Sequence, residues 1–515
     1  MSIIHLRDVG VILSRTLFQA VTLSVGRGDR VGLIGNNGAG KSTFLRCIAG
    51  DQEPTSGSIA RARGVRIRRI EQEMLPGLER MTLRESVVAA LPVSELHSRG
   101  WEVEALLDKI EIPESVREGL IEEQSGGWRR LALIARAWIA GFDTLLMDEP
   151  TNHLDLSKVL VLERLLGQVS DAQSIIVASH DRRFLDSSTN RTLFLRTGAS
   201  RYYSASYSTA CLLLAADDEM IARQHQKGTR ELTRLERSAH DLRQIGVNRH
   251  SDAALKKSTQ VARRARSIEG NLPVLHREVK ANIRLANRTT HAKLPLLIEN
   301  FRVRAPDGRA LFSIRRLEVG VGERVAVLGR NGVGKSQLLH AIHRAATNRN
   351  DRASANTISV SSALTVAYLD QEHAVLPAGE MVHSHLVRTC ALSEQTATKL
   401  LVTAGFGVDQ HHAQIGNLSP GQRARLALLV IRLAEANFFI LDEPTNHLDI
   451  AGQEQLEVEL AGNEVTCILV SHDRQFVRNV ATRYCLIEND RLREIPDPEV
   501  FYAGLSNRRR QNSEC

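Results

Sequence analysis

Two acidic segments can do chemistry, and the same eight residues form both. The sequence Asp-Glu-Pro-Thr-Asn-His-Leu-Asp runs from Asp148 to Asp155 and again from Asp442 to Asp449. An apolar run precedes each copy, at 144–147 and 438–441, as is typical of a buried parallel strand. Adjacent carboxylates at a buried strand end need partners, which a metal ion with a polarised water would supply. An acidic turn would explain one copy but not two, so we expect both at the ligand-binding edge of a parallel sheet.

A glycine-rich loop lies about 107 residues before each acidic pair. The pattern Gly-x-x-x-x-Gly-Lys-Ser occupies residues 35–42 and 329–336, each time between an apolar run and an apolar-periodic segment. This strand, loop and helix context is typical of a phosphate-binding loop, whose backbone N–H groups face phosphate oxygens. In such a loop the lysine neutralises the β- and γ-phosphates and the serine hydroxyl binds Mg²⁺. A single match arises by chance, but two in the same context do not.

Three further polar residues recur in pairs: Gln72 with Gln371, Ser125 with Ser419, and His180 with His472. Each has a structural explanation, as an exposed glutamine, a helix N-cap or an incidental histidine after a strand. A glutamine at a strand end also reaches a metal or a water, and a serine and glycines at a helix start form an anion site. Recurrence at matching places favours the functional interpretation.

The spacing of these residues predicts an internal repeat, which sets the elements that position them. Lysine, serine and glutamate recur at an offset of 294, histidine at 292 and glutamine at 299. We therefore expect an α/β protein with two homologous domains, each with a parallel core sheet, an antiparallel portion and a helical subdomain. The predicted boundaries are a first domain at 1–204, a helical linker at 205–294, a second domain at 295–505 and a short basic tail at 506–515.

Composition restricts the class of protein. The 515 residues are 43% hydrophobic with a formal net charge of +8, which mildly favours a polyanionic partner. No apolar run reaches a membrane-spanning length and the N-terminus lacks a signal-peptide pattern, so we expect no membrane insertion. Six scattered cysteines without a C-x-x-C pair favour the reducing cytoplasm and argue against structural zinc.

The linker has a different character. Leu232, Leu235, Ala239 and Leu242 recur at heptad-like spacing and predict an amphipathic helix over about 210–244. We expect a turn at Gly246 and Asn248 and a second helix near 252–269 that Gly270 and Asn271 end. The polar faces carry Arg234, Arg237, Arg243, Arg249, Lys256, Lys257, Arg263, Arg264 and Arg266. Such a hairpin either only joins two domains or contacts a polyanion, mainly through phosphates.

Taken together, these features resemble the pattern of ATP-binding cassette ATPases. They are the phosphate loop, the glutamine, the Ser-Gly-Gly or Ser-Pro-Gly helix start, the Asp-Glu strand end and the later histidine. The duplicated Glu-Pro-Thr-Asn-His-Leu-Asp form, without membrane segments, resembles the ABC-F family. The resemblance covers both cassettes and the linker. It implies a monomer whose two cassettes close head-to-tail on two ATP molecules and hydrolyse ATP to ADP and phosphate with Mg²⁺. It also favours a ribosomal partner, rRNA or tRNA, reached through the basic hairpin.

The same resemblance assigns roles to residues. Asp148 and Asp442 would hold Mg²⁺, Glu149 and Glu443 would polarise the attacking water, and His180 and His472 would contact the γ-phosphate. Asp155 and Asp449 would lie at the cassette interface. The implied nucleotide contacts are Gly35, Asn36, Asn37, Gly38, Ala39, Gly40, Lys41, Ser42, Thr43, Gln72, Ser125, Gly126, Gly127, Gly329, Arg330, Asn331, Gly332, Val333, Gly334, Lys335, Ser336, Gln337, Gln371, Ser419, Gly421 and Gln422, with Ser42 and Ser336 also on the metal.

Several residues depart from the family pattern. The first signature has Gln124 and Trp128, and the second has Pro420, which removes a backbone donor. These changes favour two unequal sites. Ile12 and Arg304 fall where an aromatic residue often stacks on adenine, so we expect no stacking there. Two other functions stay open: the ATP-binding subunit of a transporter and a DNA-associated ATPase.

Overall fold

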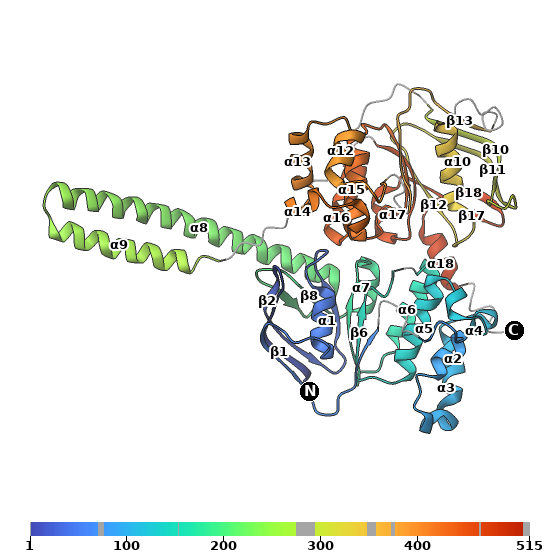
Figure 1. The fold of residues 1–515 in the computed structure, drawn as a ribbon, viewed down its shortest axis with the longest axis horizontal. Helices are drawn as coiled ribbons and strands as arrows, with labels where there is room; N and C mark the ends of the chain where they lie inside the picture. The colour runs from blue at the N-terminus through green and yellow to red at the C-terminus, as the bar shows by residue number, and fades with distance from the viewer. Residues whose placement is uncertain are drawn as a thin grey trace.

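The protein is described by a computed structural model (Figure 1). The structure describes residues 2–70, 77–152, 154–273, 294–347, 357–371, 376–462 and 465–507.

The first cassette is built on two sheets. One is antiparallel in the order β2-β1-β4, and the other has the order β5-β6-β7-β3-β8-β9, parallel except at β9. The strands are β1 (Ser2–Ile12), β2 (Thr16–Gly26), β3 (Arg30–Ile34), β4 (Ser56–Arg61), β5 (Ile67–Ile70), β6 (Thr144–Asp148), β7 (Ser174–Ala178), β8 (Arg191–Phe194) and β9 (Arg201–Tyr203). The helices are α1 (Lys41–Ala49), α2 (Leu83–Val88), α3 (Leu96–Lys109), α4 (Glu114–Arg117), α5 (Gly126–Ile139), α6 (Leu156–Gly167) and α7 (Arg182–Ser188).

The second cassette repeats this order in one continuous sheet, β13-β10-β11-β18-β17-β12-β16-β15-β14. Its strands are β10 (Leu296–Arg304), β11 (Ala310–Val319), β12 (Arg324–Leu328), β13 (Ile358–Val360), β14 (Val366–Leu369), β15 (Phe438–Asp442), β16 (Thr466–Val470), β17 (Arg483–Glu488) and β18 (Arg491–Ile495). Its helices are α10 (Lys335–Thr347), α12 (Val382–Thr389), α13 (Glu394–Thr403), α14 (Val408–His411), α15 (Pro420–Leu433), α16 (Ile450–Gly462), α17 (Arg474–Val480) and α18 (Glu499–Asn507). The prediction of two tandem α/β cassettes is confirmed.

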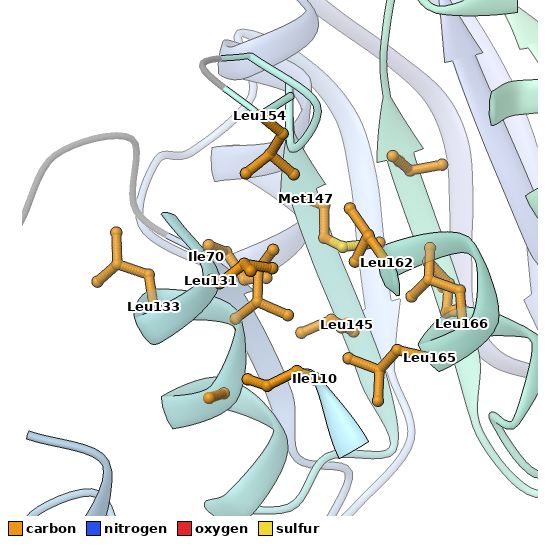
Figure 2. Packing of buried hydrophobic residues seen from close by; sticks show 14 of the residues in the cluster. Ile70, Ile110, Leu131, Leu133, Leu145, Met147, Leu154, Leu162, Leu165 and Leu166 are labelled. Carbon is orange, nitrogen blue, oxygen red and sulfur yellow. The ribbon is translucent and has the colours of Figure 1, made fainter. Parts of the chain in front are cut away.

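The acidic strands are the centres of their cores, because helices cover them on both faces. All five residues of β6 and all five of β15 are buried. On one face of β6, Figure 2 shows Leu145 and Met147 packed against residues of α5 and α6, among them Leu131, Leu162 and Leu165. On the other face, Leu146 belongs to the same buried cluster as residues of α1. A strand buried on both faces reads as a continuous apolar run, which explains why these strands stand out in the sequence. The rigid packing fixes the carboxylates that follow.

A long helical hairpin joins the cassettes and projects away from both (Figure 1). It consists of α8 (Tyr207–Asn248) and α9 (Asp252–Gly270), as the sequence predicts in outline. The turn at Gly246 is wrong, because α8 continues to Asn248 and His250 adopts the left-handed conformation with φ 49°. No helix within the described ranges combines the length and the apolar character needed to cross a bilayer.

Candidate functional site

Each phosphate loop leaves the carboxyl end of a central strand and enters a helix. The first links β3 to α1 and the second links β12 to α10. Gly40 has φ 92° and Gly334 has φ 104°, a region that favours glycine. A Cβ atom at Gly40 would lie 3.1 Å from the Leu17 side chain, so the loop also needs glycine for its close approach to β2. The local backbone is thus the curled loop that the sequence predicts.

The loop lysines fold back over their own loops. Lys41 Nζ donates to the Gly35 carbonyl at 2.8 Å and lies 3.0 Å from His180 Nε2. Lys335 Nζ donates to the Gly329 and Arg330 carbonyls at 2.9 and 3.0 Å. Burial lowers the pKa of both lysines, and the nearby carboxylates oppose this shift. Each ammonium group is therefore held inside the loop where an anion would bind.

The glutamates after β6 and β15 have the same unusual geometry. Glu149 has φ 46° and Glu443 has φ 50°, which is strained for a residue with a side chain. The backbone N–H of His180 donates to Glu149 Oε2 at 3.3 Å, and that of His472 donates to Glu443 Oε2 at 3.0 Å. The opposite oxygens, Oε1, lie 3.2 and 3.4 Å from the imidazole Nε2 atoms. Each glutamate thus meets its histidine at the edge of the sheet.

Burial controls the protonation of these pairs. It raises the pKa of Glu149 and of Glu443 to about 7. Burial first, and then the loop lysine, lowers the pKa of His180 to about 3 and that of His472 to about 4. The imidazoles are therefore neutral near pH 7, and the carboxylates titrate in the range that suits a general base.

The aspartates have the surroundings of a hard-cation site. The hydroxyl of Ser336 hydrogen-bonds Asp442, whose pKa is raised by burial. Within the described part of the chain, Asp442 Oδ1 is buried and accepts no hydrogen bond. Mg²⁺ prefers one or two carboxylates together with hydroxyl, water and phosphate oxygens. Ser336 and Asp442 fit such an ion, and Ser42 and Asp148 line the same cavity from the first cassette.

A cavity of about 1080 Å³ lies between the two cassettes. The predicted residues on its wall are Asn36, Asn37, Gly38, Lys41, Ser42, Asp148, Glu149, His180, Asn331, Gly332, Gly334, Lys335, Ser336, Gln337, Gln371, Ser419, Gly421, Asp442, Glu443 and His472. Residues almost 300 positions apart in the chain therefore face one space. Ser125, Gly126 and Gly127 start α5 but are not part of this wall. Gln72 and His153 lie outside the described residues.

The first phosphate loop contacts the second cassette directly. Asn37 N donates to Asp449 Oδ2 at 3.0 Å, and Asn37 Nδ2 donates to the His447 carbonyl at 3.0 Å. Gly421 lies so close that a Cβ atom there would stand 2.5 Å from Asn37 Nδ2. Arg425 holds Asp449 from behind at 2.6 Å. The loop of one cassette therefore faces the Ser-Pro-Gly helix start of the other.

The counterpart of Asp449 in the first cassette is Asp155, and its hydrogen bonds are different. Asp155 accepts hydrogen bonds from the Ser157 hydroxyl at 2.6 Å and from Lys158 Nζ at 2.5 Å, within its own cassette. Its charge still acts on Lys335 and His472, so it lies near the second phosphate loop.

The two helix-start serines differ as well. Ser419 caps α15 through a capping box with Gln422, so the structural explanation as an N-cap holds there. Ser125 occupies the N-cap of α5 without a side-chain capping bond.

Two arginines at the site were missed in the sequence. Arg15 Nη2 donates to the Gly38 carbonyl at 3.1 Å, over the first phosphate loop. Its recurrence as Arg309, at the same offset of 294, was the available signal. Arg130 Nη2 donates to the Asp148 carbonyl at 2.5 Å and so ties α5 to the end of β6. Its counterpart is Ala424, so the repeat gave no signal for it.

The comparisons with known proteins agree with this geometry. The ABC transporter family model matches residues 18–152 and 314–446. The chain is 30% identical, over 93% of its length and 94% of the relative, to a protein described as "Probable ATP-binding protein YbiT" from Escherichia coli O157:H7. It is 28% identical to ABC transporter F family member 5 of Arabidopsis thaliana, over 95% of this chain and 75% of the relative. It is also 28% identical to ribosome protection protein VmlR of Bacillus subtilis, over 94% and 87%.

Solved structures share the fold. An archaeal ribosome recycling factor, aABCE1, in complex with stalk protein aP1 has a TM-score of 0.61 at 19% identity, over 97% of this chain and 92% of that one. An RNase-L inhibitor has a TM-score of 0.60 at 20% identity, over 97% and 93%. The duplicated cassette, the site geometry and the full-length relatives agree: the chain belongs to the ABC-F family of ATP-binding cassette proteins.

Proposed function

We propose that this protein is a Mg²⁺-dependent ATPase whose two cassettes enclose two ATP molecules and whose hairpin acts on the ribosome in the cytoplasm. The contact between Asn37 and Asp449 carries the first part of the proposal. It brings a phosphate loop and the opposite helix start to one cavity, so ATP there would touch both cassettes. Binding energy would then favour the paired arrangement.

In this proposal the residues have separate tasks. The loop N–H groups and Lys41 or Lys335 bind the phosphates, and each neutral histidine donates a ring N–H to a γ-phosphate oxygen. Glu149 and Glu443 accept the proton of the attacking water, for which their raised pKa values are suited. When bound, Mg²⁺ would neutralise phosphate charge, held by Ser42 with Asp148 and by Ser336 with Asp442.

The basic surface of the hairpin supports the proposal of a nucleic-acid partner. Arg234, Arg237 and Arg243 of α8 are exposed, and so are Lys256, Lys257 and Arg263 of α9. Their apolar faces pack against each other, so the basic side chains point to solvent. Such a surface binds phosphates through counterion release. One relative is named a ribosome protection protein, which favours rRNA or tRNA over other polyanions.

Sedimentation with ribosomes tests the proposal. The protein with Glu149→Gln and Glu443→Gln should bind ATP but not hydrolyse it, and so remain paired. We expect it to sediment with ribosomes in ATP and not in ADP. Adding Lys256→Gln, Lys257→Gln and Arg263→Gln should abolish the ATP-dependent binding.

A matched control removes the same charge elsewhere. Arg7, Arg63 and Arg68 are exposed residues of the first cassette and are not part of the hairpin. Changing these three to Gln should leave sedimentation unchanged at the same ionic strength, because only hairpin charge contacts the partner. Equal loss with both triple variants would contradict recognition through the hairpin. Sedimentation that does not depend on nucleotide would contradict control by ATP.

A further inference from the structure

Two buried ion pairs cross from one cassette to the other in a reciprocal arrangement. Arg182 pairs with Glu457, with Nη1 3.3 Å from Oε2 and a second contact between Nη2 and Oε1. Arg474 Nη2 lies 2.5 Å from Glu163 Oε1. Both arginines directly follow the Asp of the Ser-His-Asp segment, and all four positions are related by offsets of 292 or 294. The two arginine side chains are 8% exposed, so each depends on its acidic partner.

Further polar side chains surround the Arg182–Glu457 pair. Asn479 Nδ2 donates to Glu457 Oε2 at 2.8 Å, which fixes the carboxylate on α16. Asp473 lies 3.5 Å from the Arg182 guanidinium. Arg182 is the first residue of α7, two positions after His180, so this pair fixes the start of α7 against the second cassette.

Helix α7 is also bound to the first turns of α8, residues 207–218, which form the root of the hairpin. Ser208, in the first turn of α8, donates its N–H to Asp186 Oδ1 at 2.7 Å and its hydroxyl to Oδ2. Tyr207 is buried, and the charges of Arg182 and of Glu454 on α16 both act on its hydroxyl. The root is therefore bound to α7 and lies within reach of charges from both cassettes.

The first turns of α8 are held to the first cassette at two more points. Arg196 forms a bidentate pair with Asp218 at 2.9 and 2.8 Å, and the Tyr203 hydroxyl donates to Asp217 at 2.6 Å. The root, residues 207–218, thus moves with β8, β9 and α7. Arg474 starts α17 instead, and the elements that follow α17 in the described residues are β17, β18 and α18, not a helical linker.

We propose that Glu457 and Arg182 are positioning residues that couple the pairing of the cassettes to the hairpin. Pairing brings Glu457 onto Arg182, which fixes α7, and α7 fixes the root of α8 through Asp186. The pair of Arg474 with Glu163 closes the other half of the interface. Its charges act on Asp181, the N-cap of α7, but within the described residues it forms no hydrogen bond or ion pair with the root. This inference rests on the ATP-driven pairing proposed above but not on any ribosomal partner.

Hydrogen–deuterium exchange, read by mass spectrometry, tests the coupling. In the parent with Glu149→Gln and Glu443→Gln, ATP should slow exchange relative to ADP in 182–188 and in 207–218. Glu457→Gln keeps the size of the side chain but removes its charge. It should cancel the ATP-dependent slowing in 207–218, a change of about tenfold in exchange rate for a typical coupling between sites. Glu163→Gln, the matched control, should leave the slowing in 207–218 unchanged.

A second variant covers the case in which Glu457→Gln fails to fold. Asp186→Asn weakens the link between α7 and α8 at an exposed place and leaves the Arg182 pair intact. It should keep the slowing in 182–188 and lose it in 207–218. Slowing in 207–218 that survives both variants would overturn the coupling, as would equal loss with Glu163→Gln. A parent without slowing in 182–188 would instead refute the ATP-driven pairing itself.

Discussion

At the scale of single residues, the two glutamates proposed to polarise water share an uncommon backbone conformation. Glu149 and Glu443 both adopt positive φ, which costs of order 1–3 kcal/mol for a residue with a side chain. A hydrogen bond holds each strained residue in place. The backbone N–H of Glu149 donates to the Ala178 carbonyl and that of Glu443 to the Val470 carbonyl, each at the end of the neighbouring strand. Strain kept at the same place in both cassettes indicates that carboxylate orientation is needed there. The structure thus supports the water-polarising role proposed for these two residues.

Gly421 gives a sharp prediction at this scale. A methyl group there would collide with Asn37 Nδ2 and with the His447 carbonyl, at 2.5 and 2.9 Å. Gly421→Ala should therefore lower hydrolysis by roughly tenfold or more, because a displacement of about 1 Å in a site costs up to about 10²-fold. It should also weaken ATP binding, because ATP binding and cassette pairing are linked in the proposed arrangement. Phosphate release and equilibrium ATP binding measure the two effects.

The control for this change is Gly167→Ala. Gly167 lies in α6 with no atom within 4 Å of an added Cβ, so hydrolysis should be unchanged. If Gly421→Ala hydrolysed ATP at the unaltered rate, the close approach of the two cassettes would not be needed for chemistry.

At the scale of elements, the sequence was most informative where burial is complete. The apolar run at 438–441 predicts a strand, and β15 is found at Phe438–Asp442, because an apolar run buried on both faces has sharp ends. The hairpin turn was misplaced because a glycine inside a helix costs only about 1 kcal/mol, less than continuing the helix gains. His250, a residue type that tolerates the left-handed region, makes the turn instead.

The ion pairs between the cassettes were beyond prediction from the sequence. Arg182 and Glu457 are 275 residues apart, and no periodicity connects them. Arg182 follows the recurrent His180 by two residues and itself recurs as Arg474 at the same offset of 292, but this repeat does not show what Arg182 contacts. Placing it required the relative position of two domains, which depends on their whole surfaces.

Substitution of Leu162 tests how much core packing over β6 stabilises the first cassette. It is 0% exposed on α6 and packs over β6 (Figure 2). Leu162→Ala should lower the free energy of unfolding of this cassette by about 2–5 kcal/mol, through lost apolar contact and a residual cavity. A chain with two cassettes does not unfold in a single two-state transition. The urea midpoint of the first cassette should therefore be measured through the hydrogen exchange of residues 144–166. Leu212→Ala is the control, since Leu212 is 74% exposed and should change the midpoint little.

At the scale of the whole molecule, the two halves are related but not equal. Asp449 accepts the Asn37 N–H from the other cassette, and Arg425 holds it in place. Asp155 is its counterpart but bonds Lys158, whose ammonium also lies 4.3 Å from the Trp128 ring centroid. Within the described residues, Asp155 makes no hydrogen bond across the interface. In the described part of the chain, the second phosphate loop therefore lacks the hydrogen bond to an interface aspartate that the first loop has.

Lys158→Ala should reduce this inequality. Without the lysine, Asp155 is free to accept from the second phosphate loop, as Asp449 does from the first. In a Glu149→Gln background, where only the second site turns over, ATP hydrolysis should rise by up to about tenfold, the effect of one hydrogen bond to a charged group of roughly 1.5 kcal/mol. In a Glu443→Gln background, where only the first site turns over, Lys158→Ala should leave the rate unchanged. Steady-state phosphate release in the two backgrounds measures both. The same change in both, or none in the first, would show that Lys158 does not keep the sites unequal.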